Sequence, residues 1–199
     1  MRVLFLLLCI SMVSVQCYYP ISYTYTIDLK SKSIEIYYRD LRSDEDVDSA
    51  VARDWHDVRN SLECHDSIYT TRYYTVVSRK VFEEDSVLSG KFQYAITPGD
   101  GAFSLVNMLR AVSGADDDNT VSWHVTGKEI FLFVDSDADY RLIKSNGKVM
   151  ETDSTTISVW SGKDSLFTFT FSVDTCCPGT SLLPHFLEDT GRKKSNAAK

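Results

Sequence analysis

The sequence predicts one globular domain built around an antiparallel β-sheet. Two stretches carry this prediction, residues 18–38 and residues 101–143. In the first, aromatic and apolar side chains alternate with polar ones on both sides of a polar turn at 30–33, which is the pattern of a β-hairpin. In the second, short segments are separated by polar turns, which is typical of a three-stranded meander. We expect the rest of the chain to pack on these strands.

The meander is expected to have strands near 104–113, 121–126 and 130–134. In the middle strand, large apolar residues alternate with Ser, His and Thr, which is the period of two that a half-buried strand needs. Gly127 and Lys128 form the turn into the third strand, where the alternation resumes.

Helical signals are weaker. Residues 40–57 are acidic, and they predict a solvated loop or a weak helix near 47–58 with Trp55 and Val58 on its inner side. Residues 81–88 are a better helix candidate because a glycine follows them closely.

The second half of the chain gives mixed signals. Residues 144–148 predict a turn and 91–96 an extended segment. Residues 166–173, LFTFTFSV, alternate at a period of two and by propensity predict a strand. Residues 181–189 predict one or two helical turns, limited by Pro184.

The first residues have the composition of a secretory signal peptide. An apolar run at 3–10 follows a basic residue, and small residues precede Cys17. The run is too short for a membrane span. We therefore expect a signal peptide at 1–16, one domain at 17–191, a polar basic tail at 192–199, and a secreted protein without a membrane anchor.

Four cysteines remain after the expected signal cleavage: Cys17, Cys64, Cys176 and Cys177. Disulfides persist in the oxidising compartments of the secretory pathway. Four cysteines permit three pairings, and adjacent cysteines rarely bond to each other. The pairing stays open at this point, with all four as disulfide candidates.

Composition and motifs argue against several function classes. The formal charge of −7 gives no basic footprint for nucleic acid. Asp135, Asp137 and Asp139 resemble the start of a calcium loop, but Tyr140 replaces the required glycine and Asn146 the required glutamate. No histidine spacing suits zinc, and no nucleophile elbow or phosphate loop occurs. The sequence predicts a binding protein rather than an enzyme, with no catalytic residue, metal or cofactor.

Residues 104–143, SLVNMLRAVSGADDDNTVSWHVTGKEIFLFVDSDADYRLI, are similar to part of the platform domain of major histocompatibility complex (MHC) class I proteins. The similarity is greatest to the divergent ligands of an activating natural-killer receptor, natural-killer group 2 member D. The landmarks that carry it are Gly101, Ala115-Asp116, Trp123, Gly127-Lys128, Phe131-Leu132-Phe133, Asp135 and Tyr140. Further landmarks are the strand 23–29, Leu182-Leu183, Phe186-Leu187 and the basic stop at 192–194.

This resemblance implies an α+β fold. An MHC class I-like platform is an antiparallel sheet covered by two long, often broken helices, and here it would have no immunoglobulin domain. The two halves would be 17–98 and 99–191, with helices from roughly 47–88 and 152–189. Ala111 stands where the family has a strand cysteine. Cys176 or Cys177 would then pair with Cys64 or, second, with Cys17.

The resemblance also implies a function. A secreted platform without an anchor resembles the soluble MHC class I-like decoy of orthopoxviruses, which serves viral immune evasion. The expected partner is a host cell-surface immune receptor of the natural-killer group 2 member D type, occupied competitively by a monomer. Aromatic residues and basic residues often anchor interfaces, which makes Tyr73, Arg79, Trp160 and Lys163 the candidate receptor-binding residues.

Two other interpretations compete with the decoy. A secreted all-β sandwich or barrel that binds a cytokine, a chemokine or a small ligand would need true strands at 166–173 and 69–77. A secreted hydrolase would need His, Asp and Ser side chains to meet in a cleft. Low helix content would favour the sandwich over the platform.

Overall fold

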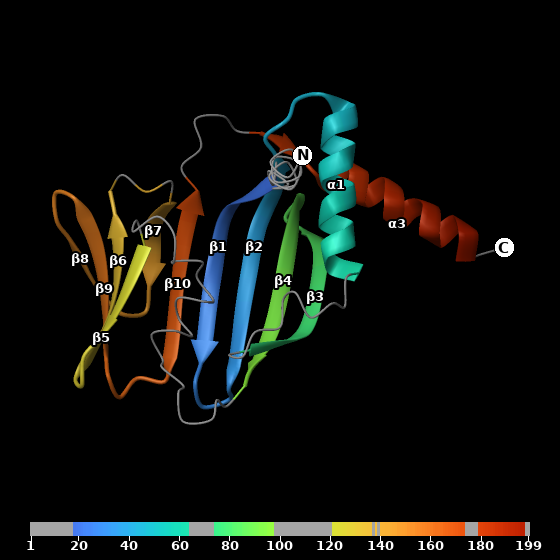
Figure 1. Ribbon diagram of the computed structural model, residues 1–199. Helices are drawn as coiled ribbons and strands as arrows, with labels where there is room; N and C mark the ends of the chain where they lie inside the picture. The colour runs from blue at the N-terminus through green and yellow to red at the C-terminus, as the bar shows by residue number, and fades with distance from the viewer. Residues whose placement is uncertain are drawn as a thin grey trace, which may run out of the picture.

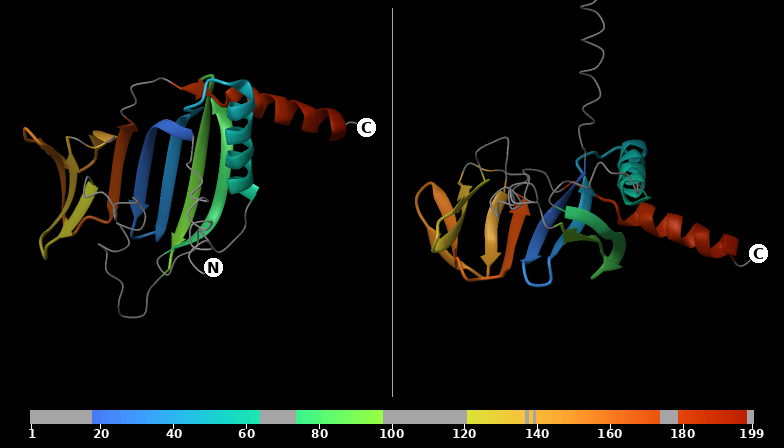
Figure 2. Two further views of the ribbon diagram at one scale, coloured as in Figure 1. Left: turned by 45° about the horizontal axis from the view of Figure 1, so that its top comes forward. Right: turned by 60° about the horizontal axis from the view of Figure 1, so that its bottom comes forward.

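The computed structural model describes residues 18–63, 74–97, 121–136, 138, 140–173 and 179–197, with side chains as far as residue 191. In these residues two antiparallel sheets and two helices are found (Figure 1). The smaller sheet and helix α1 lie at opposite ends of the larger sheet (Figure 2).

The larger sheet has the strand order β3-β4-β2-β1-β10-β7, and the short β11 pairs with β2. The strands are β1 (Tyr18–Asp28), β2 (Ser33–Ser43), β3 (Tyr74–Glu84), β4 (Val87–Ile96), β7 (Tyr140–Ser145), β10 (Leu166–Val173) and β11 (Thr180–Ser181). Alternate side chains of the central strands point to one buried face, because successive residues of a strand face opposite sides of the sheet.

The predicted first hairpin is confirmed. Strands β1 and β2 pair antiparallel, with Ile27 opposite Ile34 and both side chains almost fully buried. The Asp28 carboxylate accepts hydrogen bonds from two backbone N–H groups of the turn, those of Lys30 at 2.8 Å and Ser31 at 3.2 Å. A hydrogen bond from the Ser31 side chain, together with these two backbone bonds, lowers the pKa of Asp28, and the backbone bonds fix the turn.

The smaller sheet contains β5 (Val121–Val125), β6 (Glu129–Asp135), β9 (Thr155–Ser161) and β8 (Lys148–Glu151), in the order β5-β6-β9-β8. The predicted strands at 121–126 and 130–134 are confirmed as an antiparallel pair. The third predicted strand, 104–113, lies outside the described residues. The next strand, β7, pairs with β10 in the other sheet, so the meander does not continue through it.

The main hydrophobic core lies where the two sheets meet. Trp123 stacks on Trp160 with ring centroids 5.8 Å apart, and both rings contact Phe169 of the larger sheet. All three side chains are at most 2% exposed. Aromatic burial on this scale makes the junction of the sheets the main source of hydrophobic stabilisation in the described residues.

Asn146 joins the two sheets at the predicted turn between β7 and β8. Its Oδ1 accepts hydrogen bonds from Trp160 Nε1 at 2.7 Å and from the Thr168 backbone N–H at 2.9 Å. Its Nδ2 donates to the Leu166 carbonyl at 3.0 Å. One amide thus satisfies polar groups of β9 and β10, which belong to different sheets.

Helix α1 (Asp48–Glu63) packs on the larger sheet near β2, β3 and β4, and α3 (Leu183–Ala197) packs beside it. The weak helix predicted at 47–58 is confirmed, and its predicted inner residues Trp55 and Val58 are buried. They belong to a second core, which consists of Leu41, Val51, Trp55, Val58, Leu88 and Leu182.

The expected MHC class I-like platform is wrong. The described helices are short, and no long helix crosses the sheet at 152–173, where β9 and β10 lie instead. In LFTFTFSV, Phe167, Phe169 and Phe171 alternate with polar residues and enter the core together. Only a strand places residues two apart on one face, so the local pattern was the correct guide.

Two local helix predictions also need correction. Residues 81–88 are not a helix but the turn and flanking strands of the β3–β4 hairpin. Asp85 and Ser86 both have positive φ, of 51° and 63°, as the central residues of a type I′ turn do. Helix α3 is longer than the one or two turns predicted, because Pro184 falls in the first turn, where its missing N–H removes no helical hydrogen bond.

Candidate functional site

The four predicted receptor-binding residues do not form one surface. Tyr73 lies outside the described residues. Trp160 is 2% exposed within the core, which removes it as a surface anchor. Lys163 is exposed at the β9–β10 turn. Arg79 lies on β3, the strand at the far edge of the larger sheet, and lines a pocket there.

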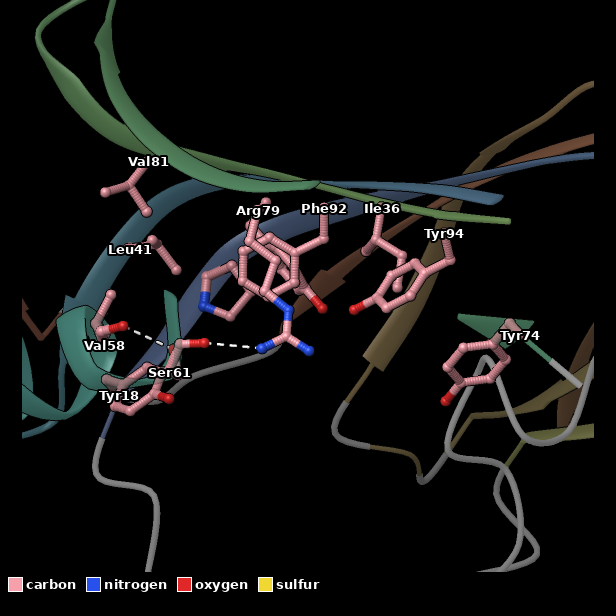
Figure 3. A pocket seen from close by; sticks show the side chains of 12 residues that line it. Tyr18, Ile36, Leu41, Val58, Ser61, Tyr74, Arg79, Val81, Phe92 and Tyr94 are labelled. Carbon is pink, nitrogen blue, oxygen red and sulfur yellow. Dashed lines mark hydrogen bonds between the residues drawn. The ribbon is translucent and has the colours of Figure 1, made fainter. Parts of the chain in front are cut away.

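The pocket lies between α1 and the face formed by β1, β2, β4 and β3 (Figure 3). Its volume is about 310 Å³. Five aromatic residues line it: Tyr18, Tyr38, Tyr74, Phe92 and Tyr94. Aliphatic side chains from β2, β3 and α1 complete most of the wall, so the interior is predominantly apolar, as ligand pockets usually are.

The pocket exists because α1 covers only part of the sheet. Val51, Trp55 and Val58 hold the helix on the second core, but the helix ends at Glu63. Near that end Ser61 lines the cavity, and its hydroxyl donates to the Val58 carbonyl at 2.7 Å. Among the described residues, the sheet's apolar face continues past this point through Ile36, Phe92 and Tyr94, which line the hollow.

Arg79 is the one charged residue among the described residues that line the pocket. Its Nη1 donates to the Ser61 carbonyl at 2.8 Å, and its guanidinium lies 5.8 Å from the Phe92 ring centre. Helix α1 has no basic residue in its own last turn. Arg79 therefore places a positive charge at the helix's C-terminal end, where the helix dipole favours a cation.

The tyrosines of the pocket show how dry its walls are. Burial raises the pKa of Tyr38 well above its usual value, and burial also raises the pKa of Tyr74. For Tyr74 the positive charge of Arg79 acts in the opposite direction. A raised phenol pKa means that the charged form is poorly solvated there.

Helix α1 is fixed by polar contacts as well as by the core. Asp189 of α3 accepts hydrogen bonds from Trp55 Nε1 at 2.9 Å and from Arg59 Nη1 at 3.0 Å. On the other side, Asp54 is 2% exposed and accepts a hydrogen bond from the buried Ser43 hydroxyl of β2. These contacts hold α1 against β2 and α3.

The described residues contain no group of three or more His, Cys, Asp or Glu side chains that could hold a metal ion. Of the aspartates that resemble a calcium loop, Asp137 and Asp139 lie outside the described part of the chain. The four disulfide candidates, Cys17, Cys64, Cys176 and Cys177, lie outside it too. Their pairing stays a prediction.

No known protein family, curated protein or solved structure matches the chain. Within the described ranges, no helix is long and apolar enough to cross a membrane. Function is therefore inferred from the chain's own residues.

Sequence reasoning missed the pocket as a site. It identified Arg79, but as a receptor-binding residue within an expected long helix, where the structure has strand β3. A usable signal was present at 91–96, where Phe92 and Tyr94 alternate with Lys91 and Gln93 and mark one aromatic face of a strand. Only the pairing of β2 with β4 shows that the pocket tyrosines of the β1–β2 hairpin share this face.

Proposed function

We propose that this chain is a secreted, predominantly β binding protein that carries a small ligand in the pocket beneath α1. The observation that carries the proposal is the pocket itself, about 310 Å³ lined by five aromatic rings and one charged residue. This size lies at the lower end of the range for small-molecule sites, about 300–1,000 Å³. No chemical conversion is proposed.

Within the sandwich interpretation, the small ligand is favoured over a cytokine or chemokine. A protein partner needs a broad surface, with about 800 Å² buried on each side of a standard interface. The pocket is instead a concave site whose aromatic walls come from four neighbouring strands, β1 to β4. Such a shape buries most of a small molecule's surface.

The receptor-decoy hypothesis stays a prediction. Neither the fold nor the comparisons bear on receptor binding, but the platform from which the decoy was inferred is wrong. Two of its four proposed contact residues, Trp160 and Arg79, are now better placed in a core and in a pocket wall. Binding to the natural-killer receptor ectodomain remains its direct test.

The test of the pocket uses the neutral fluorescent dye phenylnaphthylamine, titrated into the secreted chain. We expect saturable binding at one site. Val81→Phe places a larger side chain in the pocket wall and should weaken the dye's affinity at least tenfold. The matched control is Val77→Phe on the same strand, because Val77 is 63% exposed and does not line the pocket.

Circular dichroism would establish that both variants keep the fold. Absence of saturable binding to the unchanged protein would contradict the proposal. Equal affinity of the dye for the two variants would place it elsewhere on the molecule, which also contradicts the proposal.

A further inference from the structure

We infer that the pocket's ligand is an amphipathic anion, a monocarboxylate whose carboxylate meets Arg79 and whose apolar part lies along the aromatic wall. This inference rests on the proposed function and specifies its ligand class. It follows from the sign and place of the pocket's charge, from the chemistry of the walls, and from the cavity's size.

The charge contrasts with the rest of the protein. The chain has a formal charge of −7, yet the one charged side chain that lines the described pocket is an arginine. In a partly buried site, charges attract more strongly than in water because solvent screens them less. The pocket should therefore favour an anion over a neutral molecule of the same shape.

Arg79 is held in a defined position. The Ser61 carbonyl lies on one side of its guanidinium and the Phe92 ring on another. Figure 3 shows the side chain extending from β3 between the end of α1 and the aromatic residues. A planar guanidinium fixed in this way suits the planar carboxylate group. Little side-chain entropy remains to be lost when a ligand binds.

The wall beside the guanidinium suits an apolar body. Ile36, Phe92 and Tyr94 form a continuous surface of neighbouring strands beside the guanidinium. Burial of a hydrocarbon chain there is favourable because it removes apolar surface from water. The small cavity selects a medium-length chain or a single ring over a long lipid tail, because long tails exceed its volume.

The experiment measures displacement of phenylnaphthylamine by decanoate and by the neutral 1-decanol. We expect decanoate to bind the unchanged protein at least tenfold more tightly than decanol. Arg79→Gln keeps an N–H that can donate to the Ser61 carbonyl but removes the charge. It should weaken decanoate binding at least tenfold, and it should leave the affinity for decanol within about twofold of that of the unchanged protein. Arg79→Lys should retain part of the preference for decanoate.

Lys80→Gln is the matched control, since Lys80 is an exposed cation on the same strand. It should change neither affinity. Raising the salt concentration from 20 to 500 mM should weaken decanoate binding severalfold and leave decanol unchanged. This measurement needs no variant, so it decides the question even if Arg79→Gln does not fold.

The outcomes separate the two proposals. If the dye binds as expected but decanoate and decanol bind equally, the carboxylate inference is wrong and the ligand pocket stands. Equal weakening of both ligands by Arg79→Gln would assign Arg79 to holding α1 and overturn the inference. If dye, decanoate and decanol all fail to bind, the proposed function itself fails.

Discussion

One face of the larger sheet is covered in two different ways. At one end the smaller sheet closes over Phe167 and Phe169, which are fully buried. At the other end α1 covers the sheet, and Phe92 stays half-buried beside a cavity. Ile36 contributes to both regions. We call these regions the filled end and the hollow end.

The difference lies in the shape of the covering element. A sheet covers an area, and its side chains interdigitate with those of the sheet below. A helix of 16 residues is a rod roughly 24 Å long that covers one stripe. The same kind of aromatic strand therefore forms a closed core under the smaller sheet and a pocket wall beyond α1. Aromatic composition alone does not distinguish structure from site.

The largest expected effect compares one phenylalanine from each end. Phe169→Ala should reduce the free energy of unfolding by about 3–5 kcal/mol, because it opens a cavity in a closed core. Phe92→Ala should cost less than half as much, because its side chain already borders a hollow. Urea unfolding followed by circular dichroism measures both. Equal losses would abolish the distinction between the two ends.

The next effect tests how tightly the sheets meet at the filled end. A Cβ atom on Gly147 would lie 2.7 Å from Ser158 Oγ and 2.8 Å from both Trp160 Cε2 and the Val159 carbonyl oxygen. Gly147→Ala should therefore cost about 1–3 kcal/mol through overpacking. Gly127→Ala is the control, since nothing lies within 4 Å of its Cβ, and should change stability by less than about 0.5 kcal/mol. If Gly147→Ala costs no more stability than Gly127→Ala, the junction of the two sheets can shift to accept the added methyl group.

Local patterns predicted much of this fold. The first hairpin, the β5–β6 pair and the inner face of α1 follow from periodicity and are confirmed. The strand at 166–173 was also evident from its alternation, and the platform interpretation wrongly set that signal aside. Each of these elements depends on residues close together in sequence, which is why the pattern sufficed.

The rest depends on contacts between distant segments. The β3–β4 turn was missed because Asp85 and Ser86 adopt positive φ without the glycine that usually marks it. The division of β7 and β8 between two sheets is accompanied by hydrogen bonds that Asn146 accepts from Trp160 of β9 and Thr168 of β10. The pocket needs β1, β2, β3 and β4 side by side. Of the candidate site, the sequence identified only Arg79.

A third effect concerns how firmly α1 is held at the hollow end. Asp189→Ala removes the carboxylate that accepts the Trp55 Nε1 hydrogen bond. It should reduce the free energy of unfolding by about 1–3 kcal/mol. Glu45→Gln is the control, because Glu45 meets Arg53 at 3.9 Å in an exposed ion pair that should contribute less than about 1 kcal/mol. Urea unfolding again measures both. A loss no larger than the control's would show that the second core alone fixes α1.

The smallest effect at neutral pH is expected from Tyr25→Phe at the filled end. Burial raises the pKa of Tyr25 well above its usual value of 10. Above pH 10 the unfolded chain loses this proton before the folded protein does, so stability falls by about 1.4 kcal/mol per pH unit for each such tyrosine. Tyr25→Phe should change the free energy of unfolding little at pH 7. Between pH 10 and 11 it should remove the part of the fall in stability that Tyr25 causes, as measured by urea unfolding.

Tyr74→Phe sharpens the comparison at the hollow end. Burial raises the pKa of Tyr74 too, but the charge of Arg79 opposes the shift. The folded pKa then lies closer to 10, and the loss of stability that Tyr74 causes ends at a lower pH than the loss from Tyr25. Tyr74→Phe should therefore flatten the alkaline fall in stability less than Tyr25→Phe does. An equal flattening would contradict the smaller upward shift of the Tyr74 pKa and would mean that the charge of Arg79 has no effect on it.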